Sequence, residues 1–329
     1  MLAIIPVAGS GTRLRPLTHS KPKALLHVGS KPIISHIIDS LIPLGCTKVV
    51  LIISYEGGNI PVHITNCHPE VEVQAVVQEE RLGLGHAVSL ARGFAAGEDV
   101  IIMYGDTIID GDFSAFIDDS VDGVISVKEV DDPRRFGVVN VDGGLITNFV
   151  EKPANPESNL AIVGFNYFTS SDILFACLDE IIDRNVMTKG EFQITDAFQL
   201  MIERGMKLKT YEIDGWFDCG TPQTLLETNR YMLAKEGGIE SLDGSIIIPP
   251  VSVPESATIT SSIIGPNVSV GSGAVIEKSI VTDSIIGSGA RVENACLDGS
   301  LIGDNAVVVE RPRILAIGDN SSIDFQVSS

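Results

Sequence analysis

Apolar and polar residues follow two different periods along this chain, and the change from one to the other divides it in two. Up to about residue 236, short apolar runs that predict buried strands alternate with segments whose apolar residues recur at helical spacing. The expected strands are 2–8, 48–54, 71–77, 100–104, 123–130 and 162–168, and the expected helices are 33–44, 85–94, 171–182 and 222–235. Strands that alternate with helices predict an α/β fold with a parallel sheet.

One stretch departs from this alternation. In residues 136–153, FGVVNVDGGLITNFVEKP, two segments of strand periodicity flank Asp142, Gly143 and Gly144, which together are a strong hairpin signal. An antiparallel hairpin beside parallel strands predicts a Rossmann-like mixed sheet.

Beyond about residue 245 the helical periodicity disappears and short units recur, among them IIGPNVSV, IIGSGARV and LIGDNAVV. Ile264, Val270 and Ile276 lie six residues apart. An aliphatic residue at every sixth position resembles the hexapeptide repeat of left-handed parallel β-helices, in which each turn buries one aliphatic side chain per face. The regular Ile-Gly pairs favour this architecture over an ordinary β-sandwich, with irregular coils expected around residues 311–313.

Composition narrows the possible functions. The chain has 329 residues, enough for two domains, and no apolar run near the 18 residues of a membrane span. Its five cysteines form no CxxC pair, which argues against a disulfide framework and a zinc cluster. A net charge of −20 disfavours nucleic-acid polymers and anionic membranes as partners. Because the first residues lead directly into a strand without a signal-peptide layout, we expect a cytoplasmic protein.

Basic residues gather where the first predicted strand ends, in the stretch GSGTRLRPLTHSKPK, residues 9–23. Gly9 and Gly11 permit backbone angles that let a tight loop direct successive N–H groups at one anion. Four cations follow, although the chain as a whole is acidic: Arg13, Arg15, Lys21 and Lys23. Ligands of α/β proteins bind at the carboxyl ends of parallel strands, so we expect a phosphate group here. The spacing fits neither the dinucleotide fingerprint nor the P-loop.

This stretch resembles the signature of the sugar-1-phosphate nucleotidyltransferases, or nucleotide-sugar pyrophosphorylases, whose pattern is roughly GxGTRLxPLT followed by PKxLLPV. It departs from the family at His27, where proline is usual. The resemblance implies that an oxygen of a sugar 1-phosphate attacks the α-phosphorus of a nucleoside triphosphate and releases pyrophosphate. It assigns Arg13 and Lys23 to catalysis, because cations must offset the charge of two approaching anions. It assigns the preceding loop to nucleotide binding, through Ala8, Gly9, Gly11 and Thr12.

The same resemblance implies a Mg²⁺ site made of two carboxylates. The apolar strand VIIMYGD ends at Asp106, where the family carries a metal-binding aspartate. Asp218, in GWFDCGTP, matches the aspartate that completes this site in the family. Mg²⁺ prefers oxygen ligands and would neutralise charge on the triphosphate.

Sugar-phosphate binding is expected from the predicted hairpin and the strand after it. Glu151 and Lys152 match the family's EKP motif, in which the glutamate binds sugar hydroxyls and the lysine binds the sugar phosphate. The resemblance also places Gly137, in FGVV, and Val163 with Gly164, in AIVGFNYF, in this pocket. The segment GEFQITD, residues 190–196, resembles a family segment too, with helix capping as its expected role.

Base recognition is expected from Gln78 and Gly83 in VVQEERLGLGHA. A glutamine amide offers a donor and an acceptor side by side, which matches the edge of uracil or thymine, although adenine would also satisfy it. The expected substrates are therefore dTTP or UTP with glucose 1-phosphate. Mannose-1-phosphate guanylyl transfer, or another nucleotide-sugar specificity, is the alternative. His86 is expected to start a helix and to take no part in the chemistry.

Two rival functions are weaker. Hexapeptide β-helices occur in acyltransferases, which usually rely on a histidine base, but all six histidines precede residue 87. A non-catalytic regulatory subunit would lose charged motif residues, and this chain retains them. We therefore expect a nucleotidyltransferase domain in residues 1–236 and, in residues 245–329, a β-helix through which the protein forms a homo-oligomer. The tail after Ala316 is expected to cap the last coil or reach a neighbouring subunit.

Overall fold

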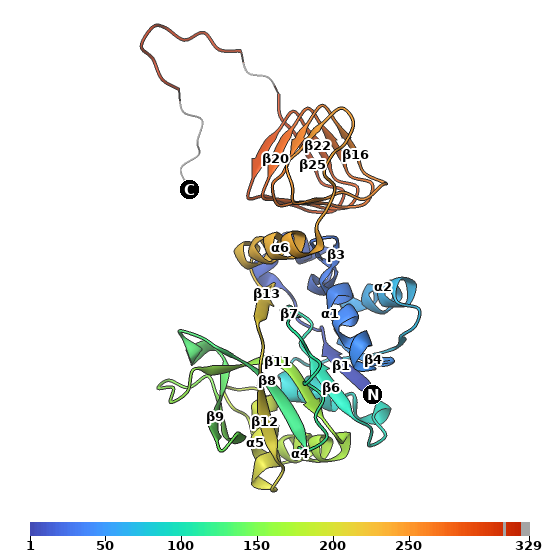
Figure 1. The fold of residues 1–329 in the computed structure, drawn as a ribbon, viewed down its shortest axis with the longest axis vertical. Coiled ribbons are helices and arrows are strands. Elements are labelled where there is room, and N and C mark those ends of the chain that lie inside the picture. Colours follow the sequence, from blue (N-terminus) through green and yellow to red (C-terminus); the bar gives the residue numbers. More distant parts are fainter. Residues whose placement is uncertain (312–313, 324–329) are drawn as a thin grey trace. The chain divides into compact units, whose positions relative to one another are not determined.

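The computed structural model describes residues 1–311 and 314–323 of the chain. The chain forms two compact units, Met1–Glu236 and Gly237–Ser329, and each is described here by itself (Figure 1). No helix in the described ranges is long and apolar enough to cross a membrane.

The first unit is built on a nine-stranded mixed sheet in which β10, β9, β11, β6, β1, β4 and β5 lie in that order. Four of these strands are parallel neighbours: β1 Leu2–Pro6, β4 Lys48–Ile53, β5 Glu72–Val77 and β6 Val100–Met103. The antiparallel part contains β8 Gly123–Glu129, β9 Gly137–Asp142, β10 Leu145–Glu151 and β11 Leu160–Phe168, and β12 Leu208–Glu212 pairs parallel to β8. The predicted mixed α/β sheet is thus confirmed, including the hairpin at Asp142.

Six α-helices accompany this sheet in the described ranges: α1 Ile33–Leu41, α2 Asn59–Cys67, α3 Leu84–Ser89, α4 Ser171–Asp183, α5 Ile194–Glu203 and α6 Pro222–Glu236. Helices α3, α4 and α5 share one apolar core with the strands, in which Val88, Phe175 and Phe198 are buried with Ile102 and Ile125. The predicted helix over 85–94 is shorter than expected, because the α-helix stops at Ser89 and a 3₁₀ turn, Arg92–Phe94, follows.

A two-stranded antiparallel ribbon joins distant parts of the first unit. Strand β7, Thr107–Asp110, pairs with β13, Gly215–Asp218, so that Thr107 lies opposite Asp218. The chain continues directly from β13 into α6, which begins at Pro222 as predicted. This ribbon fixes the start of α6 beside the end of β6.

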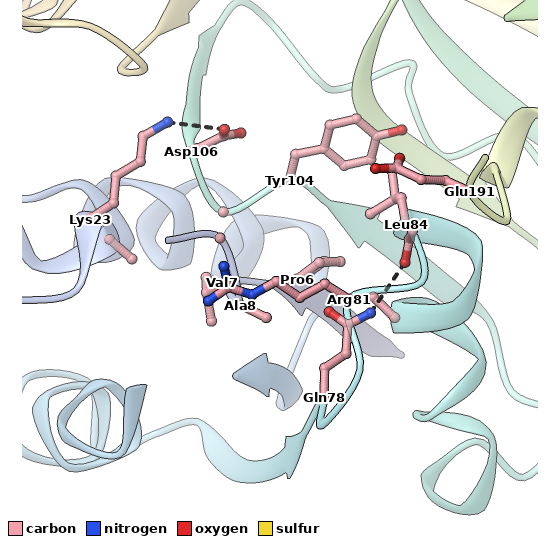
Figure 2. A pocket seen from close by; sticks show the side chains of 15 residues that line it. Pro6, Val7, Ala8, Lys23, Gln78, Arg81, Leu84, Tyr104, Asp106 and Glu191 are labelled. Carbon is pink, nitrogen blue, oxygen red and sulfur yellow. Dashed lines mark hydrogen bonds and ion pairs between the residues drawn. The ribbon is translucent and has the colours of Figure 1, made fainter. Parts of the chain in front are cut away.

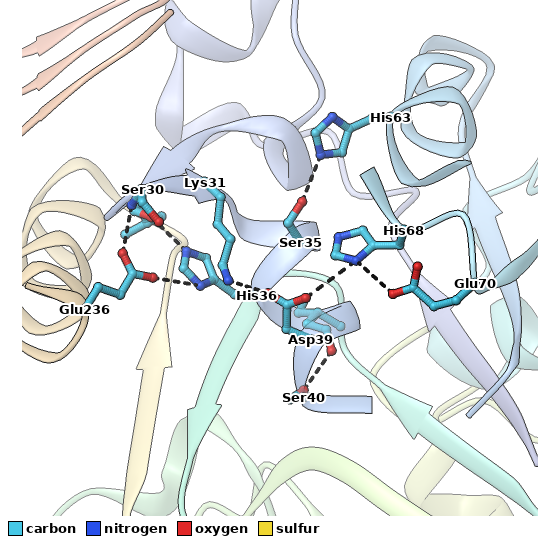
Figure 3. A network of polar contacts seen from close by, with 12 residues as sticks. Ser30, Lys31, Ser35, His36, Asp39, Ser40, His63, His68, Glu70 and Glu236 are labelled. Carbon is cyan, nitrogen blue, oxygen red and sulfur yellow. Dashed lines mark hydrogen bonds and ion pairs between the residues drawn. The ribbon is translucent and has the colours of Figure 1, made fainter. Parts of the chain in front are cut away.

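A network of polar contacts holds α6 to α1, and α1 to α2 (Figure 3). His36 on α1 donates from Nε2 to the Val28 carbonyl at 2.8 Å, and its Nδ1 lies 3.6 Å from Glu236 on α6. The other Glu236 oxygen accepts the Ser30 N–H at 2.9 Å. On the far side of α1, the His68 Nδ1 lies 3.5 Å from Asp39. Burial outweighs the Glu236 charge and lowers the pKa of His36.

The second unit is a left-handed parallel β-helix with three faces of four parallel strands each (Figure 1). One face has β14 Ile246–Ile247, β17 Ile263–Ile264, β20 Ile280–Thr282 and β23 Cys296–Asp298; the second has β15 Val251–Ser252, β18 Val268–Val270, β21 Ile285–Ile286 and β24 Leu301–Ile302. The third has β16 Thr258–Thr260, β19 Val275–Glu277, β22 Arg291–Glu293 and β25 Val307–Val309. The predicted repeat residues Ile264, Val270 and Ile276 face its apolar core.

The predicted end of this unit is only partly described. Residues 312–313 and 324–329 lie outside the described residues. Most of the irregular coil expected at 311–313, and the last part of the expected cap, therefore lie outside them too. The described tail residues Ile317 and Ile323 are exposed and belong to no strand.

Candidate active site

The glycine-rich loop follows β1 directly. The Val7 N–H still bonds to Ile52 in the neighbouring strand at 2.8 Å, and the chain then leaves the sheet. Gly11 adopts a left-handed φ of 56°, which glycine permits without a Cβ penalty, and the Thr18 hydroxyl donates to its carbonyl at 2.8 Å. Among the described residues, no partner accepts from the backbone N–H groups of residues 8–12. These five donors are available to an anion.

Lys23 and Asp106 form an ion pair at the edge of this loop, with Nζ 3.0 Å from Oδ2 (Figure 2). The lysine side chain is 11% exposed and the aspartate side chain 50% exposed, so the carboxylate faces outward while the cation is nearly buried. Gly105 brings the two segments together, because a Cβ there would lie 2.2 Å from Val7 Cγ1 and 2.8 Å from the Pro6 carbonyl. The small residue before Asp106 is thus required by the close approach of β1.

Asp218 reaches the same region through the β7–β13 ribbon. The Cys219 N–H donates to the Asp106 carbonyl at 3.1 Å, so the two predicted metal carboxylates start from bonded backbone segments. A Cβ on Gly220 would lie 2.8 Å from both Arg13 Nη2 and Asp218 Oδ1, which places Gly220 between these two side chains. Burial raises the pKa of the Cys219 thiol to about 12, so it stays protonated and takes no charge in the site.

The residues present fit a Mg²⁺ ion that is shared with substrate. Within the described ranges, no group of three or more histidine, cysteine or carboxylate side chains gathers as a closed metal site. Two aspartates with adjacent backbones match Mg²⁺, which binds through one or two carboxylates together with substrate phosphates and water. In the structure Lys23 and the Thr107 hydroxyl contact the two Asp106 oxygens, at 3.0 and 3.3 Å.

A cavity of about 330 Å³ opens beside Lys23 and Asp106 (Figure 2). Its lining includes six of the residues predicted from the sequence, namely Ala8, Gly9, Lys23, Gln78, Gly83 and Asp106. The volume is in the range of small-molecule sites. Gly11, Thr12, Arg13 and Asp218, as well as the five predicted sugar-phosphate residues, lie outside this lining.

Gln78 differs in one respect from the interpretation based on sequence, in which its amide gives both a donor and an acceptor to the base. In the structure the amide Nε2 lies 3.2 Å from the Gly83 carbonyl and 3.2 Å from His86 Nδ1. Both N–H bonds are therefore occupied, and only Oε1 is left for a ligand.

The predicted sugar-phosphate residues gather around the end of β10. Glu151 accepts a hydrogen bond from the Thr195 hydroxyl at 3.0 Å and lies 3.2 Å from Lys152 Nζ. A Cβ on Gly137 would lie 3.0 Å from the Glu151 carboxylate, so this glycine leaves room for it. Val163 belongs to this group by sequence only, because its side chain is 2% exposed and packs in the core.

Tyr104 links the two halves of the site and was not predicted from the sequence. Its ring lies where a Cβ on Gly164 would be, 2.1 Å from Cδ2, and Gly164 adopts a φ of 92°. Burial raises the pKa of Tyr104, and the charges of Glu151 and Asp106 raise it further. The ring belongs to a residue that also lines the cavity. The phenol remains protonated at neutral pH.

Two further acidic residues come from the segment GEFQITD, for which the sequence predicts only a capping role. Glu191 lines the cavity. Asp196 has a buried Oδ2 without a hydrogen-bond partner in the described part of the chain, and burial together with the nearby Glu151 raises its pKa. The resemblance of this segment to the family was the available signal for both.

Comparison with known proteins yields one family and several relatives. A family described as nucleotidyl transferase matches residues 2–235. The UTP–glucose-1-phosphate uridylyltransferase AglF of Haloferax volcanii is 36% identical over 68% of this chain and 93% of its own. A glucose-1-phosphate thymidylyltransferase of Streptomyces antibioticus is 32% identical over 80% of this chain and 75% of its own. A Bacillus anthracis structure with bound sucrose, described as a putative glucose-1-phosphate thymidylyltransferase, superposes with a TM-score of 0.62 at 28% identity, over 70% of this chain and 95% of that one.

Proposed function

This chain belongs to the nucleotidyl transferase family and acts on a nucleoside triphosphate and a sugar 1-phosphate; from that premise we propose that UTP or dTTP and glucose 1-phosphate are its own substrates. In the proposed reaction, a phosphate oxygen of glucose 1-phosphate forms a bond to the α-phosphorus. The bond between the α-phosphorus and the bridging oxygen breaks, and pyrophosphate leaves with the electron pair.

The observation that carries this proposal is the cavity in which Lys23, Asp106 and Gln78 meet the glycine-rich loop. It combines N–H donors that have no partner among the described residues with a nearly buried cation, and both suit phosphates. It also contains a carboxylate, which suits a metal ion, and an amide, which suits a base. Groups that are already in place stabilise developing charge without the cost of reorganisation. Together with positioning, this stabilisation accounts for almost all of the rate enhancement in enzymatic phosphoryl transfer.

Arg13 and Lys23 are proposed to act on the phosphates. Arg13 is exposed and has no ion-pair partner among the described residues, so its planar guanidinium is free to bind the triphosphate. Lys23 is held by Asp106 and is proposed to contact the α-phosphate or the leaving pyrophosphate.

Asp106 and Asp218 are proposed to hold Mg²⁺. When bound, the ion supplies positive charge that offsets the negative charge on the triphosphate oxygens. The family's use of a divalent ion supports this assignment. Because Asp106 also pairs with Lys23, this one carboxylate would arrange both kinds of positive charge at the cavity.

Glu151 and Lys152 are proposed to bind the sugar hydroxyls and the sugar phosphate. Their mutual contact at 3.2 Å holds the lysine near the carboxylate, and the Thr195 hydroxyl fixes the other glutamate oxygen. Gly137 and Gly164 are proposed to shape the sugar pocket by leaving room for the Glu151 carboxylate and the Tyr104 ring, with Val163 supporting Gly164 from the core.

The substrate assignment can be tested with a panel of pyrophosphate-release assays. UTP, dTTP, GTP, ATP and CTP are each combined with the 1-phosphates of glucose, mannose, galactose and N-acetylglucosamine. We expect the highest kcat/KM for UTP or dTTP with glucose 1-phosphate, and loss of activity on chelation that Mg²⁺ restores. Preference for GTP with mannose 1-phosphate would support the alternative guanylyltransferase instead.

The β-helix unit is proposed to join subunits into a homo-oligomer and to take no part in the chemistry. Every proposed site residue lies in residues 8–218, within the first unit. A cytoplasmic location is proposed with it, as for the family in general.

A further inference from the structure

The orientation of the Gln78 amide is fixed by a neighbour that can only accept. A backbone carbonyl oxygen has no hydrogen to give, so the amide atom 3.2 Å from the Gly83 carbonyl must be the nitrogen. Gln78 is 8% exposed and lies at the end of β5, where its own N–H bonds to Ile53 at 2.8 Å. The side chain therefore has one orientation that satisfies its surroundings.

His86 occupies the second amide hydrogen. Its Nδ1 lies 3.2 Å from Gln78 Nε2, and because that nitrogen donates, Nδ1 must be the unprotonated acceptor. The ring is thus neutral and carries its hydrogen on Nε2. Burial lowers the pKa of His86 and so favours this form; Glu80 is the charged group that opposes it, while Arg81 and Glu191 line the same cavity.

Gln78 and Gly83, which the amide hydrogen bond joins, leave the cavity one acceptor and one donor. Gln78 Oε1 accepts no hydrogen bond, and the Gly83 N–H donates none, within the described part of the chain. An acceptor next to a donor complements a ring N–H next to a carbonyl, as in uracil and thymine. Cytosine presents a bare ring nitrogen and an amino group at the corresponding positions, which would oppose acceptor to acceptor and donor to donor.

We propose that His86 is a positioning residue for base selection: it holds Gln78 with Oε1 toward the base, so that the cavity selects uracil or thymine and rejects cytosine. The inference rests on the proposed uridylyl or thymidylyl transfer. A protonated His86 would place a donor against the Gln78 donor. The amide could then relieve the conflict only by turning over, which gives up the Gly83 carbonyl and presents Nε2 to the base. Selection against cytosine should therefore weaken as the pH falls.

The test compares kcat/KM for UTP and for CTP with glucose 1-phosphate at several pH values between about 5.5 and 8. In His86→Leu, the ratio of UTP to CTP at pH 8 should fall by about tenfold or more, the size expected when a buried hydrogen bond is lost. The loss should be mainly in KM, because the base is bound equally in the ground state and the transition state. His86→Gln keeps an acceptor and should restore most of the ratio.

In wild-type protein, the ratio of kcat/KM for UTP to that for CTP should decrease toward acid pH. In His86→Leu, this ratio should no longer change with pH. His63→Leu is the matched control, because burial also lowers the pKa of His63, which bonds to Ser35 at 2.9 Å and does not line the cavity. An unchanged ratio in His86→Leu, or an equal fall in His63→Leu, would overturn the inference while the proposed function stands. If wild-type protein forms no nucleotide sugar from UTP or dTTP, the proposed function itself fails.

Discussion

Lys23 and Asp106 form the contact on which the proposed chemistry most depends. The lysine is nearly buried, at 11% exposure, and its partner carboxylate lies 3.0 Å away. A buried cation that loses its partner is costly, so this pair holds its geometry before any substrate arrives. The same carboxylate is proposed to bind Mg²⁺, which makes Asp106 a point where two positive charges are arranged at once.

Replacing either proposed metal carboxylate should slow the reaction strongly. Asp106→Asn and Asp218→Asn each remove one negative charge while keeping the side-chain shape. We expect each to lower kcat by on the order of 100-fold, since loss of one group that stabilises charge costs several kcal/mol in such reactions. Steady-state pyrophosphate release at saturating Mg²⁺ measures this. Asp142→Asn, in the exposed hairpin turn, is the control, and near-normal turnover in both site variants would contradict the assignment.

Arg13 and Lys152, two of the three proposed phosphate-binding cations, should differ in their kinetic signature. Lys152→Ala should raise the KM for the sugar 1-phosphate, whereas Arg13→Ala should lower kcat, because its guanidinium matters most as charge moves in the transition state. Lys278→Ala is a matched control for Lys152→Ala, because both lysines have a left-handed φ, 49° for Lys278 and 44° for Lys152. Lys278 lies in the second unit, away from the proposed site residues in sequence. An unchanged KM in Lys152→Ala would show that its proposed role is wrong.

Among the candidate site residues, those of a contiguous motif are the ones for which local sequence was sufficient to make a prediction. The glycine-rich loop and Lys23 lie in one short segment, and local spacing was sufficient to predict a phosphate site. Tyr104 was not predicted because its position depends on packing between β6 and β11, which no local pattern records. Asp196 lies in a segment that resembles the family, but its burial beside Glu151 depends on how α5 packs. The orientation of Gln78 was missed for a related reason: an amide looks the same in sequence whichever way its neighbours turn it.

At the scale of elements, the buried strands and the alternating strands of the hairpin were predicted well, and the short strands β7, β12 and β13 were not. Strands β1, β4 and β6 are continuous apolar runs, as expected where a parallel sheet is covered on both faces. Strand β12, LKTYE, carries polar residues, and β7 and β13 pair only through a contact between distant parts of the chain. Helix α2 is not among the predicted helices, because it contains Pro61 and few buried residues, which leaves only a weak helical pattern of apolar residues.

The burial of His36, on α1 beside α6, should make the first unit sensitive to acid. Since burial lowers the pKa of His36 in the folded state, the unfolded chain, with a pKa near 6.5, takes up the proton first. Stability is therefore fully present above about pH 6.5 and decreases below it, by up to about 1.4 kcal/mol per pH unit for one histidine. The decrease ends when the pH reaches the lowered pKa of the folded state.

Urea unfolding followed by the fluorescence of Trp216, the single tryptophan, should show this slope between about pH 7 and 5. His36→Gln retains an N–H donor for the Val28 carbonyl and should give a shallower pH dependence. His19→Gln replaces an exposed histidine whose side chain makes no hydrogen bond to a described residue, and it should leave the slope unchanged. Identical slopes for wild type and His36→Gln would show that another group titrates.

At the scale of the whole molecule, the division into two units was visible in the sequence because the period of the apolar residues changes. Each β-helix turn needs only a short aliphatic signal, and Ile264, Val281 and Ile286 are fully buried as the repeat requires. Assembly is harder to predict, since it would depend on the outward residues of the same strands, and the hexapeptide pattern of buried aliphatic residues does not specify these.

One outward row of the β-helix is apolar and is the surface on which we expect subunits to meet. Ile246, Ile263 and Ile280 stand in register on neighbouring strands, with Ile246 59% exposed and Ile280 44% exposed. Aligned exposed isoleucines on a flat face are unusual in a monomer. A second copy of the same face could cover them in a two-fold contact. The corresponding row of a neighbouring face is mixed: it contains Thr258 and Arg291, which suit solvent, together with Val275 and Val307.

Full-length protein carrying Ile246→Lys and Ile280→Lys should therefore form a smaller assembly than wild type when measured by light scattering at micromolar concentration. The substitutions point outward, so the apolar core of the β-helix should remain intact, and nucleotidyl transfer per subunit should persist because the proposed site residues lie in the first unit. Thr258→Lys with Thr260→Lys places the same charge on the face that already holds Arg291 and should leave the assembly unchanged. A wild-type protein that is monomeric under these conditions, or equal dissociation by both pairs of lysines, would refute the isoleucine row as the contact surface.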